Sequence, residues 1–263
     1  MKPIPTAGFS VLTLNLRFGL AEDGPRAWRH RRPALGRFLE AHPCDFMTFQ
    51  EANDFQIDFL ATCLPRHSYV GRRDPAPPFW QHNLVFFRPP WRLDGWEHFF
   101  LSPTPDIPSR FPDSRWPRQC TLGRFSDGSR ELVCATTHLD FATAVQVASA
   151  GIILTRVAAM AADRPVILTG DFNCTPTSAC HTVFTHTERS PGQPPAGFRN
   201  ALAPDFPGTF HGFHGGAGSR CIDWILYRGA LIRDQAGVLP FAPDPVYPSD
   251  HYPVKAAFRW HSR

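Results

Sequence analysis

The sequence predicts a single α/β domain spanning residues 1–263. Single α/β domains of this length are common. The chain is 43% hydrophobic and 19% charged, a composition typical of a folded globular protein. Short apolar runs of strand character alternate with stretches of helical spacing, and several of the runs stop at a polar side chain. These three observations favour a sheet covered by helices, with polar groups along one edge.

Strands are predicted where short apolar runs alternate with polar residues or stop at turn signals. In chain order they cover residues 9–16, 45–51, 83–88, 91–101, 120–125, 131–137, 166–169, 221–227 and 254–258. Helices are predicted from Pro33 onward and over residues 55–64 and 142–162. Pro33 is placed in a first helical turn, where a proline is tolerated. The Asp127-Gly128 pair predicts a hairpin between the fifth and sixth strands.

The run at residues 166–169 leads directly into Gly170-Asp171-Phe172-Asn173. Asp171 and Asn173 are two residues apart, which on an extended backbone places both side chains on one face. A plain turn would also explain the pattern, because Asp and Asn bond their own backbone in turns. His138 ends the strand that precedes helix 142–162, so a crossover connection predicts that His138 lies beside Asp171.

Other polar residues also stand at strand ends. Asn15 and Glu51 close the first two strands, and carboxylates at the rim of an α/β sheet are typical metal ligands. Asp223 lies among apolar neighbours, where a buried carboxylate needs a partner. Asp250 and His251 precede the last strand. One such residue indicates little, but their repetition at strand ends predicts a site.

Charge and cysteine content narrow the class of protein. A net charge of +4 with a pI of 8.8 suits an anionic substrate but falls short of a dedicated nucleic-acid-binding arm. Seven scattered cysteines predict no disulfide framework. Residues 1–5 lack the apolar core of a signal peptide, and no apolar run is expected to be long enough to span a bilayer. A cytoplasmic location with reduced thiols, and no obligate protein partner, are therefore expected.

The loops offer further candidates. Residues 102–117 contain five prolines and Trp116, and such a long loop is expected to wall a substrate pocket. The basic cluster at residues 29–32 is interpreted as a solvated face, with phosphate contact as the alternative. A zinc site at His211 and His214 is disfavoured, because no carboxylate or Cys stands at ligand spacing.

Together these segments resemble the endonuclease/exonuclease/phosphatase superfamily of metal-dependent phosphohydrolases, and within it a bacterial subgroup with largely undefined substrates. The resemblance rests on residues 13–17, 50–51, 137–140, 170–173, 222–225 and 249–254. It implies a four-layer α/β sandwich, in which two mixed, mainly antiparallel β-sheets pack face to face and are covered by helices.

The resemblance also implies roles for individual residues around a Mg²⁺ or Mn²⁺ ion. The metal ligands would be Glu51, assisted by Asn15 and Asp250. Asp171 would orient or deprotonate the water, Asn173 would donate to the phosphoryl oxygens, His138 and His251 would contact the phosphate, and Asp223 would pair with His251. Candidate substrate contacts are Arg118, Trp116 and Asn83. Oxygen ligands and a hard divalent ion suit the hydrolysis of phosphate esters.

Two departures limit the transfer. Many subgroup members carry Glu where this chain has Gln81, which leaves any contact at that position open. Abasic-site DNA endonucleases carry a carboxylate shortly after the first Asn, whereas this chain has Arg17, so a DNA-repair role is not expected.

The favoured function is a phosphodiesterase or nuclease that promotes in-line attack of water on a phosphate ester. Rim residues that would suit single-stranded nucleic acid, or only pack loops, are Trp80, Trp116, Arg72, Arg73, Arg110 and Arg115. A phosphomonoesterase acting on a small metabolite, an inositol phosphate or a phospholipid is the alternative. A catalytically silent binding protein is disfavoured, because the catalytic set is complete.

Overall fold

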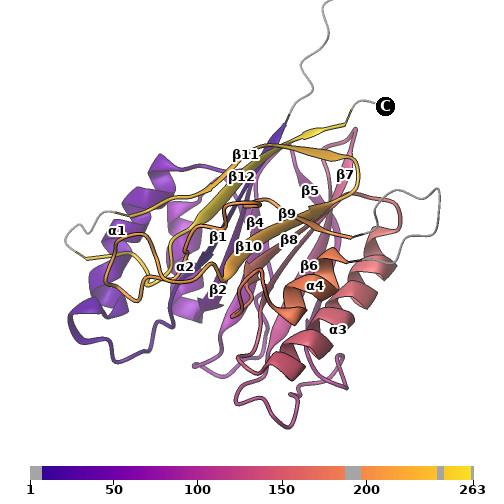
Figure 1. The fold of residues 1–263 in the computed structure, drawn as a ribbon. Helices are drawn as coiled ribbons and strands as arrows, with labels where there is room; N and C mark the ends of the chain where they lie inside the picture. Colours follow the sequence, from indigo (N-terminus) through magenta and orange to yellow (C-terminus); the bar gives the residue numbers. More distant parts are fainter. Residues whose placement is uncertain (1–7, 187–196, 242–245, 262–263) are drawn as a thin grey trace, which may run out of the picture.

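The computed structural model describes residues 8–186, 197–241 and 246–261. Two six-stranded sheets pack face to face, with α1 and α2 on one outer side and α3 and α4 on the other (Figure 1). This arrangement confirms the predicted four-layer α/β sandwich. The N-terminal residues 1–5 and part of the Gly/Pro-rich stretch at residues 190–220 lie outside the described ranges.

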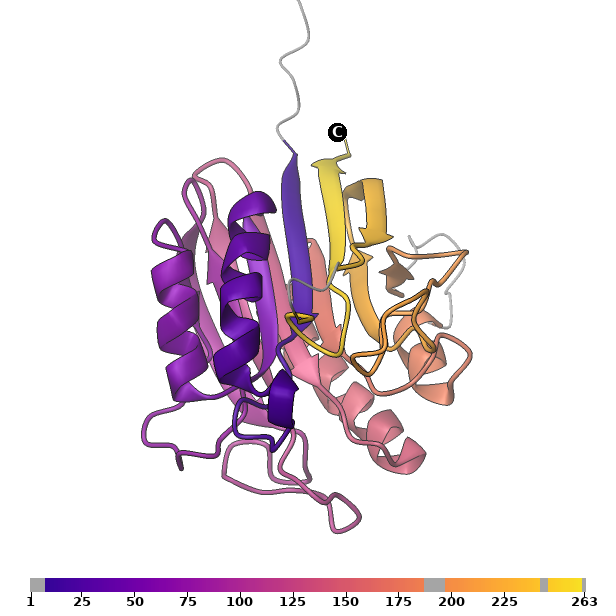
Figure 2. The same cartoon turned by 90° about the vertical axis from the view of Figure 1, so that its left-hand side faces the viewer.

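The first sheet has the strand order β11-β12-β1-β2-β4-β3. Its strands are β1 (Phe9–Asn15), β2 (Phe46–Ala52), β3 (Ser68–Val70), β4 (His82–Phe87), β11 (Leu231–Val238) and β12 (Val254–Trp260). Every neighbouring pair is antiparallel except β1 and β2, which α1 (Trp28–Ala41) connects. Helix α2 (Asp54–Cys63) lies beside α1 on the same outer face (Figure 2).

The second sheet repeats the scheme in the order β5-β6-β7-β8-β10-β9. Its strands are β5 (Arg92–Phe100), β6 (Gln119–Ser126), β7 (Glu131–His138), β8 (Val166–Asp171), β9 (Arg199–Asn200) and β10 (Asp223–Arg228). Only β7 and β8 are parallel, and α3 (Thr143–Ala161) connects them. The short helix α4 (Ala179–Thr185) packs against α3.

Each sheet therefore contributes one parallel pair made by a helical crossover, and parallel strands end at the same edge of their sheet. His138 and Asp171 are register partners at the ends of β7 and β8, as the crossover predicted. Asn15 pairs with Gln50 at the corresponding ends of β1 and β2. Because the two sheets are stacked, the polar ends of both pairs meet at one rim of the sandwich.

The layer between the sheets changes character toward this rim. Away from it the packing is aromatic, as between Phe46 of β2 and Phe125 of β6, whose ring centroids are 5.1 Å apart. Toward the rim, Thr48 Oγ1 lies 2.8 Å from Thr169 Oγ1 of the opposite sheet. Hydroxyl and amide groups there bond to one another across the sheets, as Gln50 Nε2 does to Thr136 Oγ1 at 2.9 Å, and these bonds hold the sheets in register.

The first helix corrects one prediction. Helix α1 begins at Trp28, so Pro33 lies inside the helix rather than in its first turn. The earlier start buries Trp28, whose ring packs on Phe59 of α2 at 5.3 Å. It also buries Arg31 completely, whereas Arg29, His30 and Arg32 are exposed, so the expected solvated face is correct for these three and wrong for Arg31. The start of the helix is therefore determined by the side chains that it buries on one face and not by the position of Pro33.

Helix α3 is long and apolar enough, by length and composition alone, to cross a membrane. That differs from the expectation that no run reaches this length. Val145, Ile153 and Val157 on one face of the helix are buried in the core. This buried face packs against the second sheet, and 39% of the apolar segment is buried inside the protein.

Candidate active site

The predicted site residues meet at the rim where the two parallel pairs end. Asn15 connects the sheets, because its Nδ2 lies 3.0 Å from Glu51 Oε1 and 3.0 Å from Asp171 Oδ2. Glu51 Oε2 in turn accepts the backbone N–H of Phe18 at 2.6 Å. Asp171 is register partner to both His138 on one side and Asp223 on the other. Two carboxylates from different sheets thus share one amide.

Backbone strain is concentrated at the same place. Arg17, Glu51 and Asn173 have φ angles of 61°, 61° and 52°, a region that side-chain-bearing residues seldom adopt. Glu51 lies where the β2–β4 register shifts, at an irregularity between Phe49 and Ala52. Such bulges re-aim a side chain next to active sites. The bulge brings the Glu51 carboxylate to the rim.

Asp171 and Asn173 are brought together by a turn and not, as predicted, by an extended backbone. Strand β8 ends at Asp171, and the left-handed conformation of Asn173 turns the chain instead of extending it. Asp171 Oδ1 accepts the Asn173 backbone N–H at 2.9 Å, as an Asp does in a tight turn. The turn still places both side chains in the site, since the Asn173 amide lies 3.0 Å from His138 Nε2.

Asp223 and His251 form the partnership that the resemblance implied. His251 Nδ1 lies 2.9 Å from Asp223 Oδ2, which also accepts the hydroxyl of Thr209 at 2.6 Å. Burial by itself lowers the pKa of His251, but the adjacent charges of Asp223 and Asp171 outweigh it and raise the pKa to about 10. His251 is therefore a cation at neutral pH, held by Asp223 with Nε2 3.8 Å from Asp171 Oδ2.

Asp171 is a buried carboxylate, and its pKa is higher than that of an exposed one. Its burial and the nearby charge of Asp223 raise its pKa to about 7, against the stabilising effects of His251, the Asn173 N–H and Asn15. A carboxylate with a pKa near neutrality is suited to accept a proton from water at physiological pH.

His138 is kept neutral. Burial, followed by the charges of Arg118 and His251, lowers its pKa well below the usual value. Arg118 Nη1 lies 3.0 Å from His138 Nδ1, and a guanidinium can only donate. Nδ1 is therefore an acceptor, in agreement with a neutral ring, and Nε2 lies 3.4 Å from Asp171 Oδ2 and 3.0 Å from the Asn173 amide nitrogen.

A cavity of about 520 Å³ opens beside Glu51, His138 and Arg118. Its other lining residues are Arg17, Phe18, Ala21, Phe79, Trp80, Gln81, Asn83, Trp116, Pro117, Gln119 and Phe141. Phe79, Trp116 and Phe141 are 62%, 52% and 68% exposed. An aromatic-walled cavity with Glu51, His138 and Arg118 in its lining is the form expected of a substrate pocket.

The candidate substrate contacts differ in how they are held. Arg118 and Trp116 line the cavity, and Arg115 stacks over the Trp116 ring at 5.0 Å. Asn83 lines it as well, but its amide donates to the Gln119 carbonyl at 2.8 Å. Arg72 instead pairs with Asp54 and Asp58, and neither it nor those carboxylates belong to the cavity lining.

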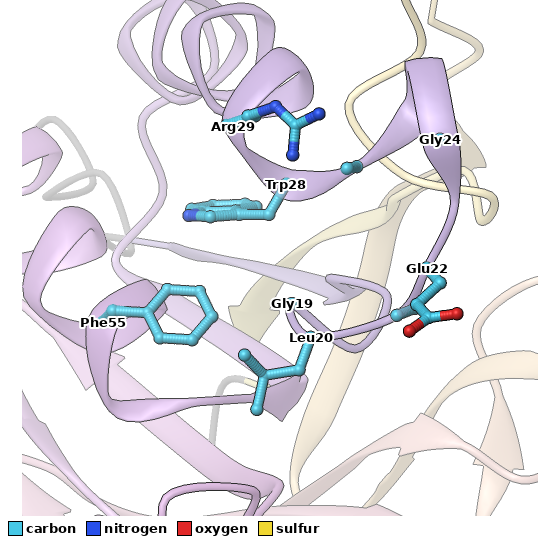
Figure 3. Close-up of a pocket in the computed structure, with 9 residues that line it drawn as sticks. Gly19, Leu20, Glu22, Gly24, Trp28, Arg29 and Phe55 are labelled. Atoms are coloured by element: carbon cyan, nitrogen blue, oxygen red, sulfur yellow. The ribbon is translucent and has the colours of Figure 1, made fainter.

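A second hollow, of about 560 Å³, lies between the loop at residues 19–24 and the start of α1. Trp28 and Phe55 form its apolar walls, with Arg29 and Glu22 at its edge (Figure 3). None of the predicted site residues lines it. The site is therefore associated with the smaller, aromatic cavity.

Sequence reasoning missed several residues that build the site. Arg31 donates to the carbonyls of Leu16 and Pro248 at 2.8 and 2.7 Å, which joins the loops that carry Asn15 and Asp250. Ser249 Oγ donates to the Asn15 carbonyl at 2.6 Å. Phe79 and Phe141 were also missed. No pattern of spacing marks such residues, because their partners lie far away in the sequence.

Carboxylates available for an ion are present in two groups. Asp171, Asp223 and His251 offer ligand atoms that lie within 4.8 Å of one another. His251 carries a proton between the two carboxylates, and a cation there would repel a metal ion. Glu51 and Asp171, joined only by the neutral Asn15 amide, are oxygen donors of the kind Mg²⁺ and Mn²⁺ prefer. The donor set therefore fits a hard divalent ion at Glu51.

The fold and the site define a two-sheet α/β protein with a buried carboxylate and imidazole centre at one rim. The chain belongs to the Endonuclease/Exonuclease/phosphatase family, whose sequence model matches residues 12–251. This family consists of hydrolases that act on phosphate esters. No curated protein matches the chain in sequence.

Solved structures give the same fold. An endonuclease/exonuclease/phosphatase from Bacteroides vulgatus is 23% identical, with a TM-score of 0.87 over 97% of this chain and 100% of its own. A family protein from Bacteroides thetaiotaomicron is 26% identical, with a TM-score of 0.84 over 97% and 99%. A mannosyl-6-phosphatase from Bacteroides thetaiotaomicron is 27% identical, with a TM-score of 0.83 over 96% and 100%.

Proposed function

We propose that the protein is a Mg²⁺- or Mn²⁺-dependent phosphodiesterase that cleaves a phosphodiester by in-line attack of water. The observation that carries the proposal is the position of Asp171. It is buried, its pKa is raised to about 7, and His251 and Asn15 flank its Oδ2 at 3.8 and 3.0 Å. A base, a fixed cation and a candidate ion ligand thus converge on one point.

In this mechanism Asp171 takes a proton from the attacking water as the water oxygen bonds to phosphorus and the ester oxygen leaves. His251, held by Asp223, lies where negative charge develops on the phosphoryl oxygens and stabilises it. The Asn173 amide adds a neutral donor, and the neutral His138 ring lies beside it. A metal ion bound at Glu51 and Asn15 would supply Lewis-acid stabilisation of the phosphoryl oxygens.

Charge pairing favours a diester over a monoester. The three site cations already face carboxylates: His251 faces Asp223, Arg118 Nε lies 4.0 Å from Asp140, and Arg17 pairs with Asp23. Of the three, Arg118 alone has a buried Nε without a hydrogen-bond partner, so one guanidinium is open to the single negative charge of a phosphodiester. A phosphodiester carries one negative charge, so its binding requires less positive charge from the site than a monoester does.

The cavity supports a bulky leaving group. Its volume of about 520 Å³ is within the usual range for ligand pockets, and its exposed aromatic side chains can stack against a ring. We propose Arg118, Trp116 and Asn83 as substrate contacts. A nucleotide unit combines a flat ring with a phosphodiester, and it fits this combination.

A phosphomonoesterase remains the second candidate, because one structural relative is a mannosyl-6-phosphatase. The test is a substrate panel: a bis-aryl phosphodiester, an aryl phosphomonoester, single-stranded DNA, RNA, mannose 6-phosphate and inositol phosphates, each with Mg²⁺ or Mn²⁺. We expect higher kcat/KM on diesters. Turnover of monoesters alone would support the second candidate, and no turnover of any substrate would favour a binding protein.

A further inference from the structure

The exposed apolar surface of the protein is concentrated beside the site. Among the residues that the structure describes, most of the exposed large hydrophobic side chains line one of two hollows, namely Leu20, Phe55, Phe79, Trp116 and Phe141. Exposed apolar side chains that gather in this way mark an interaction surface.

The two hollows share a wall. One is the aromatic cavity of about 520 Å³, which has Glu51 and His138 in its lining, and the other is the loop hollow of about 560 Å³ between residues 19–24 and the start of α1. Ala21 lines both of them. A substrate held at the catalytic groups therefore has the loop hollow as its neighbouring surface.

The loop that separates the two hollows is held in place. The Phe18 backbone N–H donates to Glu51 Oε2 at 2.6 Å, and the Gly19 backbone N–H donates to Asn53 Oδ1 at 3.0 Å. A Cβ atom at Gly19 would lie 2.6 Å from the Phe55 ring, so the loop packs directly against α2. The loop hollow is therefore formed before any ligand arrives, which lowers the entropic cost of binding.

The loop hollow has an apolar wall with a cation beside it (Figure 3). The ring centroids of Trp28 and Phe55 are 6.4 Å apart, and Phe55 and Leu20 are 38% and 49% exposed. Arg29 is exposed, and no ion pair within the described ranges includes it. Glu22 also lines the hollow, so a phosphate is expected on the Arg29 side. Apolar rings next to an arginine suit a flat ring that carries a phosphate.

We propose that the loop hollow is a second substrate subsite, which binds the nucleoside on the side of the scissile phosphate opposite the leaving group. Arg29 contacts the next phosphate along the strand. The inference rests on the proposed phosphodiesterase function and specifies its substrate as a single-stranded nucleic acid.

A lipid surface is the alternative occupant, because it would also attract exposed apolar and basic side chains. Side chains that enter a membrane surface project from one face of an amphipathic helix. The exposed side chains here instead line two concave hollows, and Phe79, Trp116 and Phe141 come from connecting loops. Adjoining concave spaces favour a strand whose rings bind one after another.

The experiment compares aryl phosphodiesters that release the same aryl group, with Mn²⁺ present. The other substituent on phosphorus is a methyl group, a nucleoside, a dinucleotide or a long alkyl chain, and the nucleoside is used in its ribo and deoxyribo forms. The measured quantity is kcat/KM relative to the methyl diester, so that effects on the chemical step cancel. For the native chain we expect a gain of about 10- to 100-fold with the nucleoside. The dinucleotide should add a further gain that high salt reduces.

Variants assign these gains to the loop hollow. Phe55→Ala should lower the nucleoside gain at least about fivefold, and Arg29→Gln should remove the further gain of the dinucleotide. The matched controls Trp96→Ala and Arg92→Gln, at exposed positions outside both hollows, should keep both gains within about twofold. If Phe55→Ala does not fold, Leu20→Ser provides the same test, because Leu20 is 49% exposed in the loop.

A gain with either sugar supports the inference, and the sugar with the larger gain distinguishes RNA from DNA. Hydrolysis of the methyl diester without any gain from the nucleoside would overturn the inference and leave the proposed function standing. A native gain in both Phe55→Ala and Leu20→Ser would overturn it as well, and so would a larger gain with the alkyl chain, which would indicate a lipid. If none of the diesters is hydrolysed, the proposed phosphodiesterase function fails and the inference fails with it.

Discussion

Asp171 Oδ2 lies 3.8 Å from His251 Nε2, and both side chains are buried between the ends of the two sheets. Their pKa values, about 7 and about 10, leave the imidazolium charged at a pH where the carboxylate can accept a proton. One buried cation thus sits next to one buried base. The predictions below follow from that arrangement.

Asp223→Asn should lower the pKa of His251. Burial alone depresses the pKa of this imidazole, and the charge of Asp223 is the first of the effects that raise it. Without that charge, burial should prevail over what remains, and the pKa should fall by more than one unit. Titration of the His251 ring signals by NMR measures it. A pKa that stays near 10 would show that Asp223 is not the partner that charges His251.

The ion-free protein should lose stability as pH rises from 7 to 8.5. His251 has a raised pKa in the folded state, so its contribution is fully present below the unfolded value of about 6.5 and is lost as pH rises through about 10. One extra proton bound by the folded state gives a slope of up to about 1.4 kcal/mol per pH unit.

Urea unfolding at several pH values measures this slope. The variant His251→Gln lacks the titrating group, so its free energy of unfolding should change less with pH than that of the native chain over the same interval. Equal slopes for the two proteins would contradict a charged His251 in the folded state.

Arg118→Gln should change His138 as well as activity. Arg118 donates to His138 Nδ1 and helps to lower the pKa of that ring, so its loss should raise the pKa. We expect kcat/KM on a diester to fall about 10- to 100-fold, as for loss of a hydrogen bond to a charged group.

The matched control is Arg92→Gln, an exposed arginine of β5 that does not line the cavity. It should leave kcat/KM within about twofold. If Arg118→Gln is as active as this control, Arg118 has no role in the site.

Trp116→Ala should raise KM more than it lowers kcat for substrates with a planar leaving group. Loss of one stacking ring costs about 1–3 kcal/mol of binding. The comparison is Trp96→Ala, because Trp96 is similarly exposed, at 44%, but lies outside the cavity lining. If both variants behave alike, the cavity does not hold the leaving group.

Elements of the fold could be predicted where the local pattern of apolar and polar residues is clear. The crossover from β7 through α3 to β8 followed from periodicity alone, and it placed His138 beside Asp171. Strand β11 was missed, because its residues from Arg233 to Ala236 are exposed and show no alternation. Helix α4 was missed because seven residues are too few for a helical period to appear.

The sequence predicted which residues belong to the site, but it did not predict how they are arranged. Polar residues at strand ends marked Glu51 and Asp171. The left-handed conformation that aims Glu51, however, depends on a bulge in the pairing with β4, and Asn173 is aimed by a left-handed turn after β8. Buried Arg31 appeared as part of a surface cluster, since its partners Leu16 and Pro248 come from distant loops. Long-range pairing of this kind has no local signature.

Hydrolysis of a bis-aryl phosphodiester by the native chain and by Asp171→Asn, with Mn²⁺ and with EDTA, tests the central claim most directly. The account predicts native turnover that EDTA abolishes and Mn²⁺ restores, and a loss of about 10²- to 10⁴-fold in a folded Asp171→Asn. Turnover that survives EDTA, or that Asp171→Asn leaves unchanged, would contradict it.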